Sequence, residues 1–79
     1  MNEDRKIARL ALAMLATIES HRFEGLSLDH LGVLYSNHSD DSNYRALLDI
    51  LRDKEVELFE GFDGSTWVRA TLYTCNEVK

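Results

Sequence analysis

Apolar residues recur at intervals of three and four along the first part of the chain, which is the period of one face of an α-helix. The pattern predicts a helix over about 4–20. Its apolar face consists of Ile7, Leu10, Ala11, Met14, Leu15 and Ile18. Residues 21–25 interrupt the pattern, and Ser27 then occupies the position of an N-cap, where its hydroxyl can accept from a free amide of the next turn. We therefore expect a second helix over about 28–36.

The polar segment 36–42 separates the second helix from a third. Its serine, asparagine and aspartate side chains tend to hydrogen-bond their own backbone, which indicates a turn followed by a helix cap. The candidate caps are Ser39, Asp40 and Asp41. The third helix is expected over about 41–53, with an apolar face of Tyr44, Leu47, Leu48 and Leu51. On the opposite face Arg45 and Asp49 are four residues apart and are expected to form an ion pair.

Alternating apolar and polar residues then predict a β-hairpin over about 56–73. A two-residue loop, Asp63-Gly64, would place charged side chains on both faces of the hairpin. A three-residue loop over 62–64, with Gly64 left-handed in a bulge, removes this conflict and is the register that we predict. One face then holds Val56, Leu58, Val68, Ala70 and Leu72. The other face holds two cross-strand pairs, Phe59 with Trp67 and Glu57 with Arg69.

The order of elements is therefore helix, helix, turn, helix and hairpin, within one domain over residues 1–79. Because a two-stranded hairpin alone is only marginally stable in water, its apolar face must lie on the helices. Gly32, which costs about 1 kcal/mol against alanine inside a helix, is expected where a neighbouring helix approaches closely. The predicted fold class is α+β, with a three-helix helix-turn-helix core followed by a two-stranded β-hairpin wing.

Three stretches of the sequence resemble the winged helix-turn-helix superfamily, over residues 7 to 73. In "GLSLDHLGVLY", Leu-Ser opens a helix and Leu31-Gly32 stand where the superfamily usually has leucine followed by a small residue. The stretch "SNYRALLDILRDKEVEL" is similar to a recognition helix that passes into the first wing strand, and "DG" is similar to a wing tip. The resemblance implies a winged-helix fold and, by association, nucleic-acid binding.

The chain departs from that superfamily in three places. The turn between the second and third helices is longer than usual and lacks the apolar residue that normally plugs it. Lys54-Glu55 stand where a glycine usually ends the third helix. Residues 36–54 carry four aspartates against three cations, which gives a net charge of −1 on the element that should approach DNA. The whole chain has a net charge of −5, which opposes approach to a polyanion.

The leading functional hypothesis is a small DNA-binding transcriptional regulator, with the third helix in the major groove and the wing on the DNA backbone. The resemblance implies that base edges are contacted from the start of the recognition helix, by Ser42, Asn43 and Arg45. Backbone phosphates would be contacted by three cations, Arg52, Lys54 and Arg69. The structural alternative is an exposed polar face in which Arg45 pairs with Asp49.

The alternative hypothesis is an acidic winged-helix module for protein–protein interaction, such as an adaptor, an inhibitor or a DNA mimic, that does not bind DNA. It rests on the net charge and on aromatic side chains at the hairpin face turned away from the core. The proposed interface residues are Phe59, Trp67 and Tyr73. These aromatics would be structural instead if the amino-terminal part of the first helix, or the tail after Tyr73, covered them.

A homodimer would change how the cations are distributed. The basic residues near the start of the chain are Arg5, Lys6 and Arg9. If the first helix of each subunit lay beside the wing of the other, these residues would extend the set of Arg45, Arg52, Lys54 and Arg69 into a positive stripe.

No enzyme, cofactor or metal site is expected. His21, His30 and His38 lie in three different segments without the spacing of zinc ligands. Cys75 is the only cysteine and has no evident base beside it in sequence, so it is expected neither as a nucleophile nor in an internal disulfide. The longest apolar run, residues 7–18, is shorter than the roughly 20 residues that span a bilayer, and no signal-peptide cleavage site follows it. These features predict a cytoplasmic protein without a membrane partner.

Overall fold

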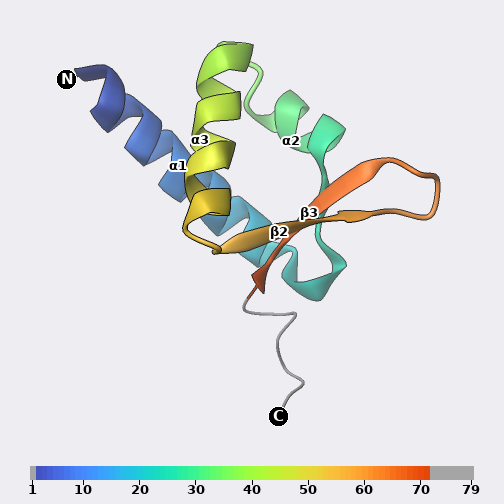
Figure 1. Ribbon diagram of the computed structural model, residues 1–79. Helices are drawn as coiled ribbons and strands as arrows, with labels where there is room; N and C mark the ends of the chain where they lie inside the picture. Colours follow the sequence, from blue (N-terminus) through green and yellow to red (C-terminus); the bar gives the residue numbers. More distant parts are fainter. Residues whose placement is uncertain (1, 72–79) are drawn as a thin grey trace.

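The computed structural model describes residues 2–71, which form three helices and a three-stranded antiparallel sheet (Figure 1). The elements in chain order are α1 (Asn2–Ser20), the short 3₁₀ helix η1 (Arg22–Glu24), β1 (Leu26–Ser27), α2 (Leu28–Leu34), α3 (Asp40–Arg52), β2 (Val56–Glu60) and β3 (Thr66–Ala70). The strand order is β1-β3-β2, so the last strand is central. In Figure 1 the tip of the β2–β3 hairpin projects away from the helices. The fold class is therefore α+β.

The three helices cover the segments that the apolar periodicity predicts, with ends that differ by one or two residues. Ser27 caps α2, since its hydroxyl accepts from the amide of His30 at 3.1 Å. Of the three candidate caps of α3, Ser39 is the one used, and its hydroxyl accepts from the amide of Ser42 at 3.1 Å. Both caps satisfy amides that the first helical turn leaves without an intrahelical partner.

The hairpin has the register of the three-residue loop. Phe59 lies opposite Trp67 and Glu57 opposite Arg69, as predicted. The amide of Gly61 donates to the carbonyl of Ser65 at 2.8 Å, and Gly64 is left-handed with φ +85°. Within the loop, the hydroxyl and the amide of Ser65 donate to the Asp63 carboxylate and hold the pKa of that carboxyl below its usual range.

The third strand is a correction to the predicted two-stranded wing. Leu26 pairs with Val68 and Ser27 with Trp67, so β3 is hydrogen-bonded on both sides. A strand of two residues carries no alternation, which is why the sequence pattern does not indicate it. The pairing fixes the segment between α1 and α2 to the hairpin, and it makes β2 the edge strand on the other side.

One hydrophobic core joins the three helices to the sheet. Its buried side chains are Leu10, Ala11, Met14, Ile18, Leu26, Leu31, Ala46, Ile50, Val56, Val68 and Ala70. Leu58 was expected among them but is 45% exposed. It lies opposite the buried Val68, on the edge strand of the sheet that residues 2–71 form, and so it lacks the cover that the central strand receives from both sides. Leu72, also expected in the core, lies outside the described residues.

Two glycines have opposite roles in this fold. A Cβ at Gly32 would meet nothing within 4 Å, so the expected close approach of another helix is wrong. Gly25 instead has φ +80° and ψ −168°, a backbone region that only glycine adopts readily. A Cβ there would lie 2.7 Å from the Val68 carbonyl oxygen and 3.0 Å from the ring of Phe59. The chain therefore passes close against β3 at Gly25.

We predict that Gly25→Ala and Gly32→Ala change stability in opposite directions. Gly25→Ala should lower the free energy of unfolding by about 2 to 4 kcal/mol, because it adds backbone strain and a steric clash. Gly32→Ala should raise it by about 0.5 to 1 kcal/mol through helix propensity. Urea unfolding followed by Trp67 fluorescence would measure both. Equal effects of the two substitutions would contradict the tight passage at Gly25.

Candidate functional site

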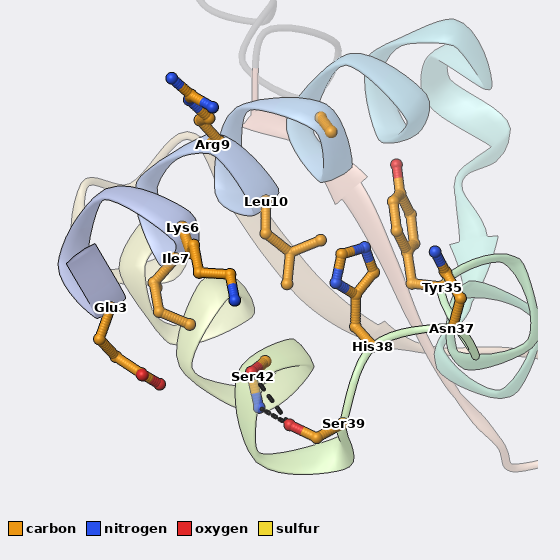
Figure 2. A pocket seen from close by; sticks show the side chains of 11 residues that line it. Glu3, Lys6, Ile7, Arg9, Leu10, Tyr35, Asn37, His38, Ser39 and Ser42 are labelled. Atoms are coloured by element: carbon orange, nitrogen blue, oxygen red, sulfur yellow. Dashed lines mark hydrogen bonds between the residues drawn. The ribbon is translucent and has the colours of Figure 1, made fainter.

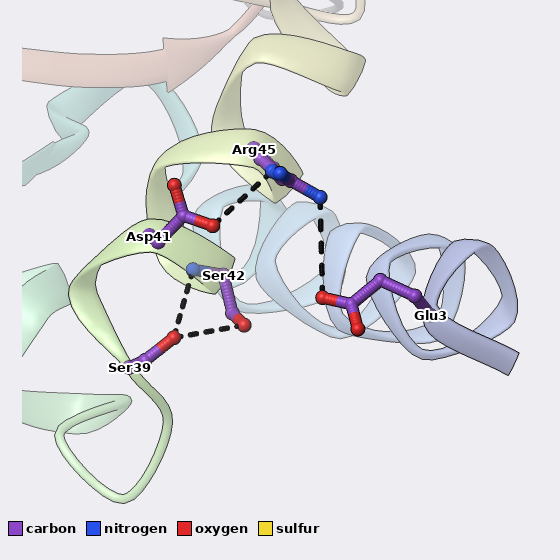
Figure 3. Close-up of polar contacts among 5 residues, drawn as sticks. All are labelled: Glu3, Ser39, Asp41, Ser42 and Arg45. Atoms are coloured by element: carbon purple, nitrogen blue, oxygen red, sulfur yellow. Dashed lines mark hydrogen bonds and ion pairs between the residues drawn. The ribbon is translucent and has the colours of Figure 1, made fainter.

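The first polar residues of α3 are engaged by the turn that precedes the helix. The Ser39 hydroxyl donates to the Ser42 hydroxyl at 3.0 Å and accepts from the Ser42 amide (Figure 3). The side-chain amide of Asn43 donates to the carbonyl of Tyr35 at 2.9 Å. Asn43 Oδ1 is buried and has no hydrogen-bond partner among the described residues. The side chain of Asn43 is thus directed toward the end of α2.

Arg45 forms ion pairs with two carboxylates, and neither belongs to the expected partner Asp49. Its Nε lies 3.2 Å from Asp41 Oδ2, and its Nη1 lies 3.9 Å from Glu3 Oε2 on α1 (Figure 3). Asp41 and Asp49 are both four residues from Arg45. The guanidinium pairs with Asp41, where it can also reach Glu3. Such exposed pairs contribute about 0 to 1 kcal/mol each, so they position Arg45 without adding much stability.

Arg52 and Lys54 are the two proposed DNA contacts that remain exposed without an ion pair among residues 2–71. Lys54 takes the left-handed conformation with φ +61°, at the position where a glycine commonly follows a helix. Its amide donates to the carbonyl of Leu51, and the amide of Glu55 donates to that of Ile50, each at 3.0 Å. These two hydrogen bonds end α3 and aim the chain into β2.

Arg69, the third proposed phosphate contact, is part of the fold. Its Nε lies 3.3 Å from Glu57 Oε2, and its Nη1 donates to the Phe23 carbonyl at 3.3 Å. The guanidinium carbon also lies 4.3 Å from the centroid of the Phe59 ring, in the geometry of a cation–π contact. Arg69 therefore joins η1 to the outer face of the hairpin, and its guanidinium is engaged by three groups of the same chain.

Phe59 and Trp67 form the predicted cross-strand pair, with ring centroids 6.3 Å apart and planes inclined by 43°. Both side chains are half-buried rather than exposed. Phe59 is covered by Gly25, the residue that follows η1, and by Arg69. Trp67 lies against Gly61, and its Nε1 donates to the Ser65 hydroxyl at 3.0 Å. Tyr73, the third proposed interface residue, lies outside the described residues.

An open hollow of about 320 Å³ lies beside this pair on the outer face of the hairpin. We call it the aromatic hollow, and its lining residues are Glu24, Phe59, Glu60, Gly61, Phe62 and Trp67. Phe62 is fully exposed at the tip of the hairpin. Sequence reasoning did not identify Glu24, Glu60 or Phe62 as site residues. The available signal was an aromatic residue within a tight turn, where polar residues are usual.

A larger hollow of about 520 Å³ lies between α1 and the turn before α3 (Figure 2). Ile7 and Leu10 contribute apolar surface to it. In Figure 2 the side chains of Lys6 and His38 point toward this space, whereas that of Arg9 points away from it. Between residues 2 and 71 no three His, Cys, Asp or Glu side chains converge in a way that could hold a metal ion. The hollow is therefore a mixed groove, lined from α1 by the apolar residues Ile7 and Leu10 and by the charged residues Glu3, Lys6 and Arg9.

No protein-family model, no curated protein and no solved structure matches this chain. In the described part of the chain no helix is both long enough and apolar enough to cross a bilayer.

We expect Arg69→Ala to destabilise the fold, although Arg69 was predicted as a phosphate contact. Losing the Glu57 pair, the Phe23 hydrogen bond and the Phe59 contact should lower the free energy of unfolding by about 1 to 2 kcal/mol. Arg52→Ala is the matched control, with an expected change within about 0.5 kcal/mol. Chemical denaturation of the two variants would measure the difference, and equal stabilities would refute a structural role for Arg69.

Proposed function

We propose that this chain is a winged-helix domain that works as an acidic protein-binding module and takes a cationic segment of its partner into the aromatic hollow. The order of elements supports the winged-helix assignment, because a helical core with a hairpin after its third helix is the arrangement that the sequence resemblance implies. The pairing of β1 with the last strand adds to that support, since it attaches the hairpin to the start of α2.

The composition of the aromatic hollow carries the proposal. Three aromatic residues, Phe59, Phe62 and Trp67, line it together with two acidic residues, Glu24 and Glu60. Aromatic faces attract ammonium and guanidinium groups by about 0.5 to 2 kcal/mol, and adjacent carboxylates add charge complementarity. The contact of the Arg69 guanidinium with the ring of Phe59 is an interaction of this kind within the chain, and it leaves the rings of Phe62 and Trp67 for a partner.

Phe62 fits the role of an anchor residue. It is fully exposed at the hairpin tip, where burial by a partner would remove a complete aromatic ring from water. Aromatic anchors of this kind carry a large share of the binding energy in protein interfaces. The net charge of −5 would favour the final approach of a basic partner, within the roughly 8 Å that screening leaves at physiological salt.

We predict that a synthetic peptide of lysine and arginine residues binds and changes the fluorescence of Trp67, the only tryptophan, whereas a glutamate peptide of equal length does not. Phe62→Ala should weaken binding by about 1 to 2 kcal/mol without changing the unfolding midpoint. Phe23→Ala is the control, because Phe23 is exposed but does not line the aromatic hollow. Unchanged affinity of Phe62→Ala, or equal binding of both peptides, would show that the hollow is not the binding site.

DNA binding is a second candidate, favoured by the element order and by the exposure of Arg52 and Lys54 at the end of α3. In this form of the proposal the domain is a transcriptional regulator, with α3 in the major groove and the hairpin on the DNA backbone. Ser42 and Arg45 would then contact base edges, and Arg45 would have to leave Asp41 and Glu3 in order to do so.

We expect titration with mixed genomic DNA at about 50 and 200 mM salt to separate the two candidates, because phosphate contacts are strongly salt-dependent. If the second candidate is correct, the double variant Arg52→Ala with Lys54→Ala should weaken binding. The slope of the logarithm of the binding constant against the logarithm of salt concentration should fall by the equivalent of about two phosphate contacts. Arg22→Ala, at a cation outside α3 and the hairpin, serves as the control. Absence of binding at both salt concentrations would eliminate DNA as the partner.

A further inference from the structure

The outer face of α1 carries an apolar stripe without cover from the rest of the described chain. Between Ile7 and Ile18 the only polar residues are Arg9 and Thr17, so this stretch is apolar around most of its circumference. Helices of that kind are usually buried on all sides. Four of the α1 side chains face the core: Leu10, Ala11, Met14 and Ile18. Leu12, by contrast, is 66% exposed, and Ala8 and Ala16, about one helical turn before and after it, are exposed as well.

From this face we infer that two copies of the chain pair through α1 in antiparallel orientation, with Leu12 of each copy at the two-fold axis. The stripe of five residues that would form the contact is Arg5, Ala8, Leu12, Ala16 and Glu19, and we call it the α1 stripe. Successive members are three or four positions apart, so they lie along one side of the helix. The α1 stripe shares no residue with the aromatic hollow, and the inference is independent of the proposed function.

The spacing of the stripe is symmetric about Leu12. Ala8 and Ala16 are each four positions away, about 6 Å along the helix axis, and Arg5 and Glu19 are each seven positions away, about 10.5 Å. An antiparallel partner therefore brings Ala8 opposite Ala16 and Arg5 opposite Glu19, and the two-fold axis repeats each contact. The small alanine side chains allow the helix axes to approach closely around the central leucines.

Charge selects the antiparallel arrangement over the parallel one. A parallel pair in the same register would place Arg5 against Arg5 and Glu19 against Glu19, which is repulsive at both ends. The antiparallel pair has an opposite charge at each end. Neither Arg5 nor Glu19 forms an ion pair within residues 2–71, so both charges are available to the second copy.

The size of the contact sets the expected strength. A single helix pair of this length belongs with the small interfaces, below about 1,200 Å² in total, which are typical of weak association. The dimer should therefore appear only at high protein concentration and should weaken as salt is added. Sedimentation equilibrium of the full chain between about 10 µM and 1 mM covers the relevant range of dissociation constants. Dimerisation would raise the mean mass from 9.1 kDa toward twice that value.

Charge reversal provides the decisive test. Arg5→Glu and Glu19→Arg should each raise the dimer dissociation constant about tenfold, because each places like charges opposite one another at both ends. The double variant should return it to within about threefold of the original chain. Both substitutions complement the helix dipole, since they put an acid near the N-terminus and a base near the C-terminus of α1, so unfolding would not explain a loss of dimer.

Leu12→Lys should abolish dimerisation, because it places two ammonium groups at the two-fold axis. Leu34→Lys is the matched control on α2, where the leucine is 47% exposed and lies outside the α1 stripe, and it should leave the dimer intact. A chain that stays monomeric up to the highest concentration would overturn the inference. It would equally be overturned if the double charge reversal dimerised no better than the single ones, or if Leu12→Lys had no effect.

Discussion

The close passage of the chain at Gly25 is the constraint on which the rest of this fold depends. Without a side chain at that position, the backbone after η1 lies directly against the Val68 carbonyl and the ring of Phe59. The next two residues then pair with β3, and Ser27 immediately caps α2. A two-stranded hairpin would be marginal in water. Here β3 is hydrogen-bonded on both sides, and the apolar face of the hairpin is covered by the helices. The conformation of Gly25 therefore connects the sheet, the start of α2 and the outer face of the hairpin.

The parts of the fold that the sequence predicts are those encoded by local patterns. Helical periodicity locates α1 and α3, and alternation with a glycine turn determines that Phe59 lies opposite Trp67. Strand β1 is too short to produce an alternation. The need for glycine at position 25 arises from its positive φ and from Val68 and Phe59, which are 43 and 34 positions away, and no local pattern encodes such contacts. Gly32 is the opposite case. A glycine inside a helix suggests that a neighbouring helix packs closely there, but the structure has open space at Gly32.

The candidate site was predictable to a similar extent. The sequence indicates the Phe59–Trp67 and Glu57–Arg69 pairs, because both follow from the register. It does not indicate that Arg69 lies over Phe59, nor that Glu24 joins the hairpin carboxylates, since both require η1 to fold against the sheet. Arg45 has an aspartate four residues away on each side, Asp41 and Asp49, and local spacing does not choose between them. The guanidinium pairs with Asp41, on the side where Glu3 of α1 also lies. Tertiary contacts decide each of these cases.

The use of the arginines within the fold determines which partners suit the surface. Arg69 is held by Glu57, Phe23 and Phe59, and Arg45 lies between two carboxylates, so neither presents an unpaired cation to a polyanion. At physiological salt the field of the net charge is screened beyond about 8 Å, and recognition is therefore decided by groups in direct contact. At the aromatic hollow the lining residues are three aromatics, two glutamates and a glycine. A basic side chain there would gain both attractions when water is excluded, whereas a phosphate would gain neither and would be repelled by the acidic residues.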